Sequence, residues 1–325
     1  MNLQGVNKKL YLNFFRERVP TRNGYGDALV ELGKKNKNIM VLCADLTEST
    51  RVHKFREAFP DRFVEIGVAE QNLVTVGSGL AAVGKIPFVS SYAMFCPGRC
   101  WEQIRTTICY NNRNVKVIGA HSGISVGPDG ATHQALEDIA IMRALPNMIV
   151  VVPADYEQTK KATKAIAEWQ GPAYMRFARE KTEQVTTAKT PFEIGKAQVL
   201  KDGKEVLLIG AGPMIHECLV AAEELQKQGI KAMVINCHTI KPLDKKTIVA
   251  AAKKCKRVVT VEEHQINGGL GGAISELLAE NHPVPIERVA VNDRFGESGE
   301  PDELLVKFGL SSQHIVKAAL RVRKR

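Results

Sequence analysis

Residues 62–83 read RFVEIGVAEQNLVTVGSGLAAV and predict a buried strand that runs directly into a helix. The apolar run 62–68 is the strand candidate, and 70–83 is a helix candidate rich in small residues. Glu70 stands at the junction of the two. A carboxylate there either stabilises the helix dipole, by roughly 0.3–1 kcal/mol, or is kept from water so that it can hold or exchange a proton. These residues alone leave both interpretations open.

Strand and helix candidates alternate in the same way through the first half of the chain. Val- and Ile-rich runs separated by helices predict a parallel sheet that is buried on both faces. The strand candidates are 38–44, 62–68, 86–91, 115–120, 148–154 and 173–178. The helix candidates lie near 24–35, 70–83, 100–111, 133–144 and 155–169. Such a sheet binds ligands beyond the carboxyl ends of its strands, where Asp45, Glu70 and His121 stand.

A second α/β unit follows a polar segment, 180–198, that lacks a clear period and that we interpret as a linker. The strand candidates of this unit are 205–210, 231–237, 257–263 and 287–292. We therefore expect an α/β fold of two doubly wound domains with mostly parallel sheets. The domains are expected to cover residues 1–185 and 186–325.

The composition is that of an ordinary soluble globular protein, with 44% hydrophobic and 25% charged residues in a chain of 325. No apolar run is long enough to span a bilayer, and the N-terminus lacks the pattern of a secretory signal. Seven scattered cysteines without a CxxC pair predict neither a disulfide framework nor a zinc site. We expect a cytoplasmic protein that binds no membrane and holds no metal with its own residues.

The formal net charge of +10 raises the question of nucleic-acid binding. The basic residues are spread along helical segments, however, with only short clusters at 253–257 and 321–325. Aromatic residues are not interleaved with them, and no nucleic-acid motif is visible. We therefore expect a solvated basic surface and no nucleic-acid partner. Steering of an anionic ligand, such as a phosphorylated metabolite, is the alternative.

A glycine-rich loop, HSGISVGPDGATHQALED (121–138), follows the fourth strand candidate. Its glycines mark a long turn in which His121, Asp129 and His133 can converge. We expect His133 in the first turn of the next helix, with Thr132 as the cap of that helix. A single histidine is more often a structural hydrogen-bonding residue, but two histidines and an aspartate on such a loop favour a binding site.

Together these segments resemble transketolase, and specifically its C-terminal half, over nearly the whole chain. In that half a pyrimidine-binding domain precedes the family's C-terminal domain. The stretch IGVAEQN (66–72) is similar to the motif that carries the catalytic glutamate of thiamine diphosphate enzymes. The resemblance implies that Glu70 bonds a ring nitrogen of the cofactor's aminopyrimidine and relays a proton.

A second stretch, SSYAMFCPGR (90–99), is similar to the family segment that packs around the aminopyrimidine ring. The resemblance implies that Tyr92 and Phe95 line this ring, although ordinary core positions are the alternative from the residues alone. We also expect Asp45, which follows the first strand candidate, on the cofactor side of the site.

The resemblance extends to the contacts with a sugar substrate. GPDGATHQ (127–134) is similar to a family loop that contacts substrate hydroxyls, which implies this role for Asp129 and His133. His121 matches a histidine near the substrate phosphate. We expect both histidines to be catalytic residues together with Glu70.

Three further stretches resemble the family's phosphate contacts. ADLTEST supplies Ser49, TRNGYG supplies Arg22 and RFARE supplies Arg179. Two arginines suit bidentate recognition of an anion. The resemblance therefore implies a sugar phosphate as substrate.

One motif of the family is missing from this sequence. Transketolases bind the diphosphate of the cofactor through a Gly-Asp-Gly motif followed by an asparagine that holds magnesium. The similar string PDGATH lies in the substrate loop and lacks that continuation. The resemblance therefore implies the C-terminal subunit of a split transketolase. An N-terminal transketolase subunit would supply the Mg²⁺ ligands and the diphosphate pocket, and we expect a heterotetramer with two copies of each subunit.

The predicted activity is the transfer of a two-carbon ketol unit between ketose and aldose phosphates, as in the pentose phosphate pathway. The triplet Ala69-Glu70-Gln71 stands where transketolases usually have Arg-Glu-His. It looks closer to deoxyxylulose-phosphate synthase and to the beta subunit of a 2-oxo acid dehydrogenase, and both alternatives stay open. A non-catalytic scaffold protein of the same fold is a third alternative, against which Glu70 argues.

Overall fold

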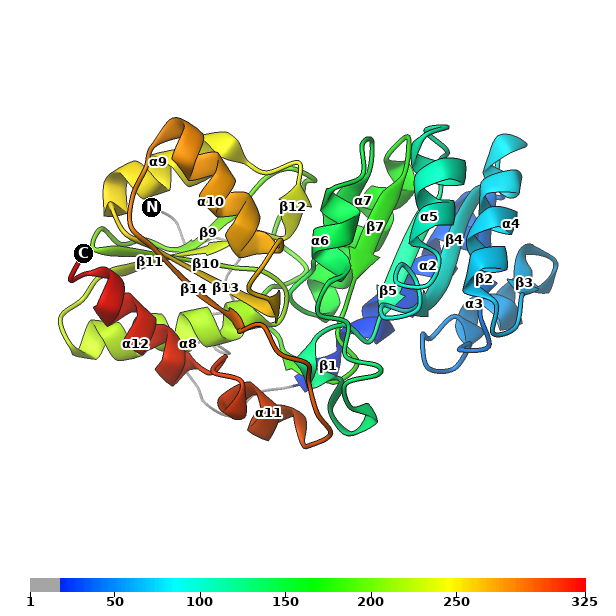
Figure 1. Cartoon of the computed structure of the whole chain (residues 1–325). Helices are drawn as coiled ribbons and strands as arrows, with labels where there is room; N and C mark the ends of the chain where they lie inside the picture. The colour runs from blue at the N-terminus through cyan, green and yellow to red at the C-terminus, as the bar shows by residue number, and fades with distance from the viewer. Residues whose placement is uncertain (1–17) are drawn as a thin grey trace.

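Two mainly parallel sheets organise residues 18–325, the part of the chain that the computed structural model describes (Figure 1). Helices cover both faces of each sheet, as expected for doubly wound α/β units. A short antiparallel ribbon joins β1 (Arg18–Pro20) to β8 (Lys181–Glu183). The predicted fold class is therefore confirmed.

The first sheet has seven strands in the order β12-β6-β7-β5-β4-β2-β3, and only β12 runs antiparallel to its neighbour. The six strands predicted for this part of the chain are present. The strands are β2 (Ile39–Cys43), β3 (Phe63–Glu65), β4 (Ile86–Tyr92), β5 (Lys116–Ala120), β6 (Ile149–Val151), β7 (Ala173–Arg176) and β12 (Thr239–Lys241). The helices are α2 (Thr21–Lys35), α3 (His53–Ala58), α4 (Glu70–Ala82), α5 (Trp101–Gln103), α6 (Asp138–Arg143) and α7 (Tyr156–Glu168). Shorter turns are the 3₁₀ segments η1 (Pro60–Arg62) and η3 (Ile124–Asp129) and the π-helical turn η2 (Ile104–Cys109).

The second sheet has five strands in the order β14-β13-β10-β11-β9, in which β9 is the antiparallel edge. The four strands predicted here are present, and β9 is additional. The strands are β9 (Gln198–Lys201), β10 (Val206–Gly210), β11 (Ala232–Asn236), β13 (Val258–Gln265) and β14 (Ile286–Val291). The helices are α8 (Met214–Lys227), α9 (Lys245–Cys255), α10 (Leu270–Asn281), α11 (Pro301–Lys307) and α12 (Ser312–Val322).

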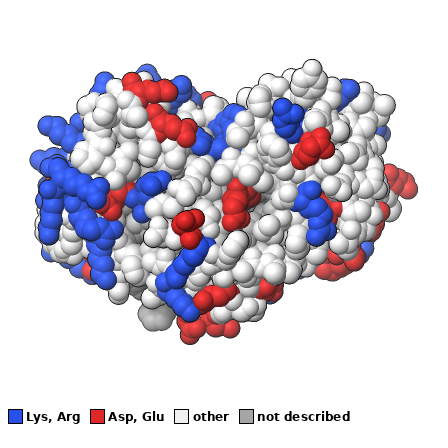
Figure 2. All heavy atoms as spheres, viewed as in Figure 1, with Lys and Arg blue, Asp and Glu red and all other residues white. Residues whose placement is uncertain are grey.

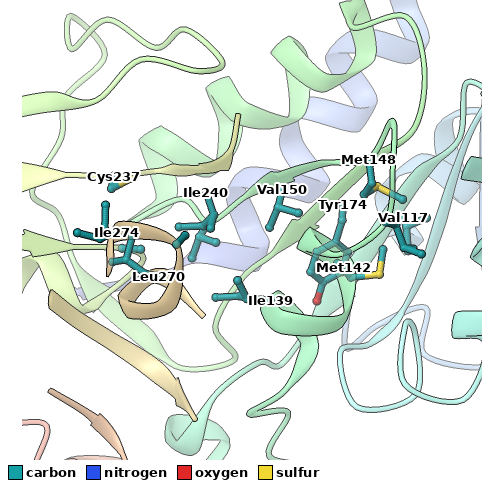
Figure 3. Packing of buried hydrophobic residues seen from close by; sticks show 14 of the residues in the cluster. Val117, Ile139, Met142, Met148, Val150, Tyr174, Cys237, Ile240, Leu270 and Ile274 are labelled. Atoms are coloured by element: carbon teal, nitrogen blue, oxygen red, sulfur yellow. The ribbon is translucent and has the colours of Figure 1, made fainter. Parts of the chain in front are cut away.

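The apolar core is continuous between the two units. Strand β12 belongs to the second half of the chain, yet it pairs with β6 in the first sheet. One buried cluster accordingly includes Val150 and Tyr174 of the first unit together with Ile240, Leu270 and Ile274 (Figure 3). This shared packing holds the two units together at the edge of the first sheet that β12 forms.

The helix predicted for residues 133–144 begins only at Asp138, so that prediction is wrong in its first five residues. His133 lies in a turn, and Thr132 does not cap a helix. The physical reason is strand pairing, because Ala135 forms a parallel β-bridge with Ser122 and is extended. The glycine-rich loop after β5, called the polar loop below (121–137), therefore crosses the end of the sheet before the helix starts.

The segment predicted as a linker, 180–198, is fastened to the first unit. It contains β8, and its next residues bind the buried carboxylate of Asp155. That carboxylate accepts hydrogen bonds from the backbone N–H groups of Val185 (2.9 Å) and Thr186 (2.5 Å) and from the Thr186 hydroxyl (2.7 Å). The first part of the segment is therefore packed along the first unit, whereas Ala197 binds Asp244 and Gln198 begins β9 of the second sheet.

Basic side chains gather at the left of the surface view, on the side where the C-terminus lies (Figures 1 and 2). Near the C-terminus, Arg321 and Arg325 both pair with Glu287, at 3.1 and 2.5 Å, which neutralises part of the local positive charge. Across residues 18–325, none of the helices combines the length and the apolar character needed to cross a membrane.

Candidate functional site

Glu70 is the first residue of α4, just after the turn that follows β3. Its side chain is 1% exposed, so the burial expected from its apolar surroundings is confirmed. One carboxylate oxygen accepts a hydrogen bond from the Ser91 hydroxyl (3.3 Å), and the other pairs with the Arg99 guanidinium (3.0 Å). The helix N-terminus and Arg99 both favour a negative charge at this place.

An aromatic wall begins next to Glu70. Tyr92 ends β4, and Phe95 lies in the turn that follows, with the guanidinium of Arg99 5.3 Å from the centre of its ring. The Tyr92 ring is 4.1 Å from the His121 ring and 6.3 Å from the Phe95 ring. Phe95 meets His133 edge-on, with 5.2 Å between the ring centres. The structure thus brings these four rings together beside the partners of Glu70.

His121 directly follows β5 and is 1% exposed. Burial, reinforced by the charges of Arg22 and Arg179, lowers the pKa of His121 to about 3, so the imidazole is neutral at pH 7. Its Nδ1 atom has no hydrogen-bond partner among residues 18–325. The backbone of His121 is left-handed (φ 54°), which is uncommon outside glycine and frequent at functional sites.

Three arginines, Arg22, Arg51 and Arg179, form a cluster on the His121 side of the wall, called the arginine cluster below. Arg22, near the start of α2, donates from Nη1 to the backbone carbonyl of Ser49 (3.0 Å). Burial and the neighbouring charges of Arg51 and Arg179 lower the pKa of Arg22. Arg179 follows β7 and donates to the Val126 carbonyl at 3.0 Å. The predicted phosphate-binding residues Arg22, Ser49, His121 and Arg179 therefore come from four different segments to one place.

Two predicted site residues are less firmly connected to this group. Asp45 follows β2 with a left-handed backbone (φ 56°), and its N–H donates to the Glu65 carboxylate (2.7 Å). Its side chain is exposed and has no hydrogen bond to any of residues 18–325. Asp129 ends η3 and is exposed, and its carboxylate has no hydrogen bond or ion pair within the described part of the chain. Their assigned contacts with cofactor and substrate remain predictions.

Sequence reasoning missed three residues of the site: Ser91, Arg99 and Arg51. Ser91 and Arg99 are in the stretch that suggested the aromatic wall, but nothing local says that they bind Glu70. Arg51 directly follows the ADLTEST stretch. A basic residue next to a predicted anion contact was the one available signal for it.

The residues fit an aminopyrimidine ring in their chemistry. A buried carboxylate can bond a ring nitrogen, and aromatic side chains next to it offer flat surfaces against which a heterocycle can pack. The Nδ1 of His121 and the Nε of Arg22 are buried without a partner among the described residues, which indicates that a polar ligand belongs near this wall. Between residues 18 and 325 no three His, Cys, Asp or Glu side chains are arranged to hold a metal ion.

A cavity of about 270 Å³ adjoins the turn that carries Phe95. Its walls include Met94 and Gly98 of that turn, Leu136 of the polar loop and Phe295 of the second unit. The loop before α11 is bound to the polar loop as well, since the Gln134 amide donates to the Glu297 carbonyl (2.9 Å). The second unit therefore supports the loop on which His133 lies.

Comparison with known proteins agrees with this site. The model of the transketolase pyrimidine binding domain matches residues 17–184, and that of the transketolase C-terminal domain matches residues 195–315. A Methanocaldococcus jannaschii protein with the provisional name of a transketolase C-terminal section is 47% identical over 308 residues, 94% of this chain and 96% of that protein. A 6-deoxy-6-sulfo-D-fructose transketolase subunit of Clostridium sp. (strain MSTE9) is 42% identical over 304 residues, 94% of each chain.

A solved structure shows the same likeness in three dimensions. A split gene transketolase, described as an inactive beta4 tetramer, is 46% identical and superposes with a TM-score of 0.89, covering 94% of this chain and 99% of that one. Both domain models, the relatives and this structure correspond to the same part of the transketolase chain, its C-terminal section. The chain belongs to the transketolase family and comprises its pyrimidine-binding and C-terminal domains.

Proposed function

We propose that this chain is the C-terminal subunit of a split, thiamine-diphosphate-dependent transketolase that transfers a two-carbon ketol unit between ketose and aldose phosphates. The observation that carries the proposal is buried Glu70, bound by the side chains of Ser91 and Arg99 beside an aromatic wall. Family membership supports the dependence on thiamine diphosphate. We place the boundary between the two domains near residue 185.

Glu70 holds the aminopyrimidine of the cofactor in this proposal, and it holds or releases a proton at a ring nitrogen. Tyr92 and Phe95 line the ring, and Asp45 contacts the cofactor from the end of β2. Ser91 and Arg99 keep the Glu70 carboxylate in one orientation, because each of them binds a different oxygen. The cofactor, when bound, supplies the carbon nucleophile for the carbon–carbon bond chemistry.

The substrate is positioned by the polar loop and the arginine cluster. Asp129 and His133 contact hydroxyl groups of the sugar. His121 is neutral at pH 7, so it donates one N–H and accepts at its other nitrogen. Arg22, Ser49 and Arg179 bind the phosphate. The Clostridium relative is named for a sulfonated sugar. That the substrate of this chain carries a phosphate is therefore a separate part of the proposal, which rests on the arginine cluster.

An N-terminal transketolase subunit completes the site in this proposal. It brings the diphosphate pocket and the Mg²⁺ ligands, and two copies of each subunit form a heterotetramer in the cytoplasm. The solved relative described as an inactive beta4 tetramer supports this need for a partner, because that assembly is described as inactive.

Reconstitution tests the proposal directly. This chain is mixed with the subunit that carries the Gly-Asp-Gly motif, thiamine diphosphate and Mg²⁺, and the release of glyceraldehyde 3-phosphate from xylulose 5-phosphate is measured with ribose 5-phosphate as acceptor. The pair is expected to be active, and each subunit alone is expected to be inactive. Full activity of the partner without this chain would contradict the proposal.

The same assay separates the two other enzyme classes. Oxidative decarboxylation of pyruvate, with no reaction of xylulose 5-phosphate, would identify a 2-oxo acid dehydrogenase. Condensation of pyruvate with glyceraldehyde 3-phosphate would identify a deoxyxylulose-phosphate synthase.

A further inference from the structure

Arg22 and Arg51 reach across each other between the start of α2 and the turn before α3. Arg22 donates from Nη1 to the carbonyl of Ser49, and Arg51 donates from Nε to the side-chain oxygen of Asn23, each at 3.0 Å. These two crossed hydrogen bonds bring both guanidinium groups to the same end of the first sheet. None of the contacts assigned above uses Arg51.

The arginine cluster carries more positive than negative charge. The charges of Arg22, Arg51 and Arg179 all act on His121, and each of them adds to the effect of burial in lowering its pKa. Arg179 pairs with Glu180 at 3.2 Å. The carboxylate of Glu48, three residues before Arg51, pairs with Arg56 at 3.2 Å, so it does not neutralise the cluster. An anionic ligand would balance this excess.

Three nitrogen groups in the cluster lack protein partners within residues 18–325. Arg51 uses Nε for Asn23 and has a long 3.5 Å contact from Nη1 to the Glu48 carbonyl, which leaves its Nη2 group without a hydrogen bond. The Nε of Arg22 and the Nδ1 of His121 are buried and also unpaired. Buried polar groups are normally satisfied, so the two buried groups, on Arg22 and His121, indicate a polar ligand at this place, and the open Nη2 group of Arg51 is a further donor for it.

The backbone at Arg51 is held in an unfavourable conformation. Its φ angle of 68° is left-handed, which is uncommon for a residue with a long side chain. Helix α2 packs tightly on it, since a Cβ atom at Gly26 would lie 2.7 Å from the Arg51 carbonyl oxygen and 2.8 Å from its Cβ. A strained position that the fold holds in place is typical of functional residues.

We propose that Arg51 makes this site select a doubly charged phosphate over a singly charged sulfonate at the end of the sugar substrate. The inference rests on the proposed function, because it takes the arginine cluster as the anion site of the substrate. A third guanidinium adds attraction in proportion to the charge of the ligand. It therefore favours the dianion more than the monoanion.

Two anions of matched size test this selection without catalysis. Methyl phosphate is doubly charged at pH 8, because the second pKa of a phosphate monoester is about 6, whereas methanesulfonate carries one charge. The affinity of each anion is measured from the rise of Tm with anion concentration, at constant ionic strength. The measurement is made on the chain and on the reconstituted complex.

Arg51→Gln is expected to lower the affinity for methyl phosphate roughly tenfold and the affinity for methanesulfonate roughly threefold. The ratio of the two affinities, which is the preference for phosphate, therefore falls. Arg51→Lys keeps the charge and is expected to retain most of the preference, which a merely structural role for the Asn23 contact would not do. Arg105→Gln is the matched control, because it removes the same charge from an exposed position on η2 outside the cluster, and both affinities should equal those of the wild type.

An equal effect of Arg51→Gln on both anions, or no effect, would overturn the inference, as would a wild-type chain and complex that bind neither anion. The inference and the proposed function can fail separately. A phosphate preference that depends on Arg51 in a complex without ketol transfer would support the first and reject the second. Ketol transfer with an unchanged preference in Arg51→Gln would do the reverse.

Discussion

Two buried glutamates stand at the beginnings of helices in this molecule, and their partners differ. Glu262 of β13 accepts hydrogen bonds from the backbone N–H groups of Leu270 and Gly271, at 2.6 and 2.8 Å, where α10 begins. Glu70 begins α4 itself, and its carboxylate binds the side chains of Ser91 and Arg99. Both are nearly inaccessible, at 2% and 1% exposure.

The difference lies in what must move when each carboxylate changes partners. Releasing Glu262 would leave N–H groups of α10 without acceptors inside the protein, which is costly. Releasing Glu70 requires that the Ser91 hydroxyl rotates and that Arg99 turns away, and the Arg99 side chain is 51% exposed. Burial and helix position are therefore shared, whereas the ability to exchange a partner belongs to Glu70.

Glu70→Gln should show the largest effect and should act on catalysis. We expect turnover of the reconstituted pair to fall about 100-fold or more, because an amide cannot relay the proton. The Tm should change little, since the amide oxygen still accepts a hydrogen bond. Glu57→Gln, at an exposed site on α3, is the control. Unchanged turnover in Glu70→Gln would remove this residue from the catalytic group.

Glu262→Gln should act on stability. We expect the free energy of unfolding to fall by about 2 kcal/mol, because one charge-assisted cap of α10 is lost and the amide N–H₂ faces backbone donors. Denaturant unfolding measures the loss, with Glu280→Gln, exposed on the same helix, as control. Turnover per folded complex should stay at the wild-type level. A loss of turnover with full stability would show that the comparison of the two glutamates is wrong.

The protonation of His121 should lower the free energy of unfolding of the protein in acid. Its folded pKa of about 3 lies below the usual value near 6.5, so the unfolded chain binds more protons between these pH values. Stability is complete above about pH 6.5 and falls as the pH drops toward 3. His121→Asn, which tolerates a left-handed backbone, should reduce the loss between pH 7 and pH 5 by about 1–2 kcal/mol. Unfolding at both pH values measures this, and parallel pH profiles for the two proteins would contradict it.

Arg99→Met should have the smallest effect. Because Arg99 is half exposed, we expect the free energy of unfolding to fall by only about 0.5–1 kcal/mol. The double variant Glu70→Gln/Arg99→Met should lose less than the sum of the single variants, since the pair is then absent on both sides. Arg105→Met, exposed on the neighbouring turn, is the control. Strict additivity would mean that Glu70 and Arg99 are not coupled.

Local pattern was sufficient for most of the sheet framework. Val- and Ile-rich runs predicted ten strands that the structure contains, because strands buried on both faces leave a continuous apolar run. The prediction that the strand before Glu70 is buried is wrong, since β3 lies at the sheet edge and has no buried residue. The pattern missed β1, β8, β9 and β12, which are short and lie at sheet edges or between the units. It also placed His133 in a helix, because a bridge between Ser122 and Ala135 cannot be read from either segment alone.

The sequence by itself determined the fold class, the position of a carboxylate at the start of a helix and, through resemblance, the family. Only the tertiary structure decided what binds that carboxylate, since Arg99 is 29 residues from Glu70 along the chain. The same holds for Arg51, which meets Arg22 only because α2 packs against the turn before α3. Apolar periodicity is a local property of the chain, whereas the pairing of polar side chains depends on which segments the sheets bring together.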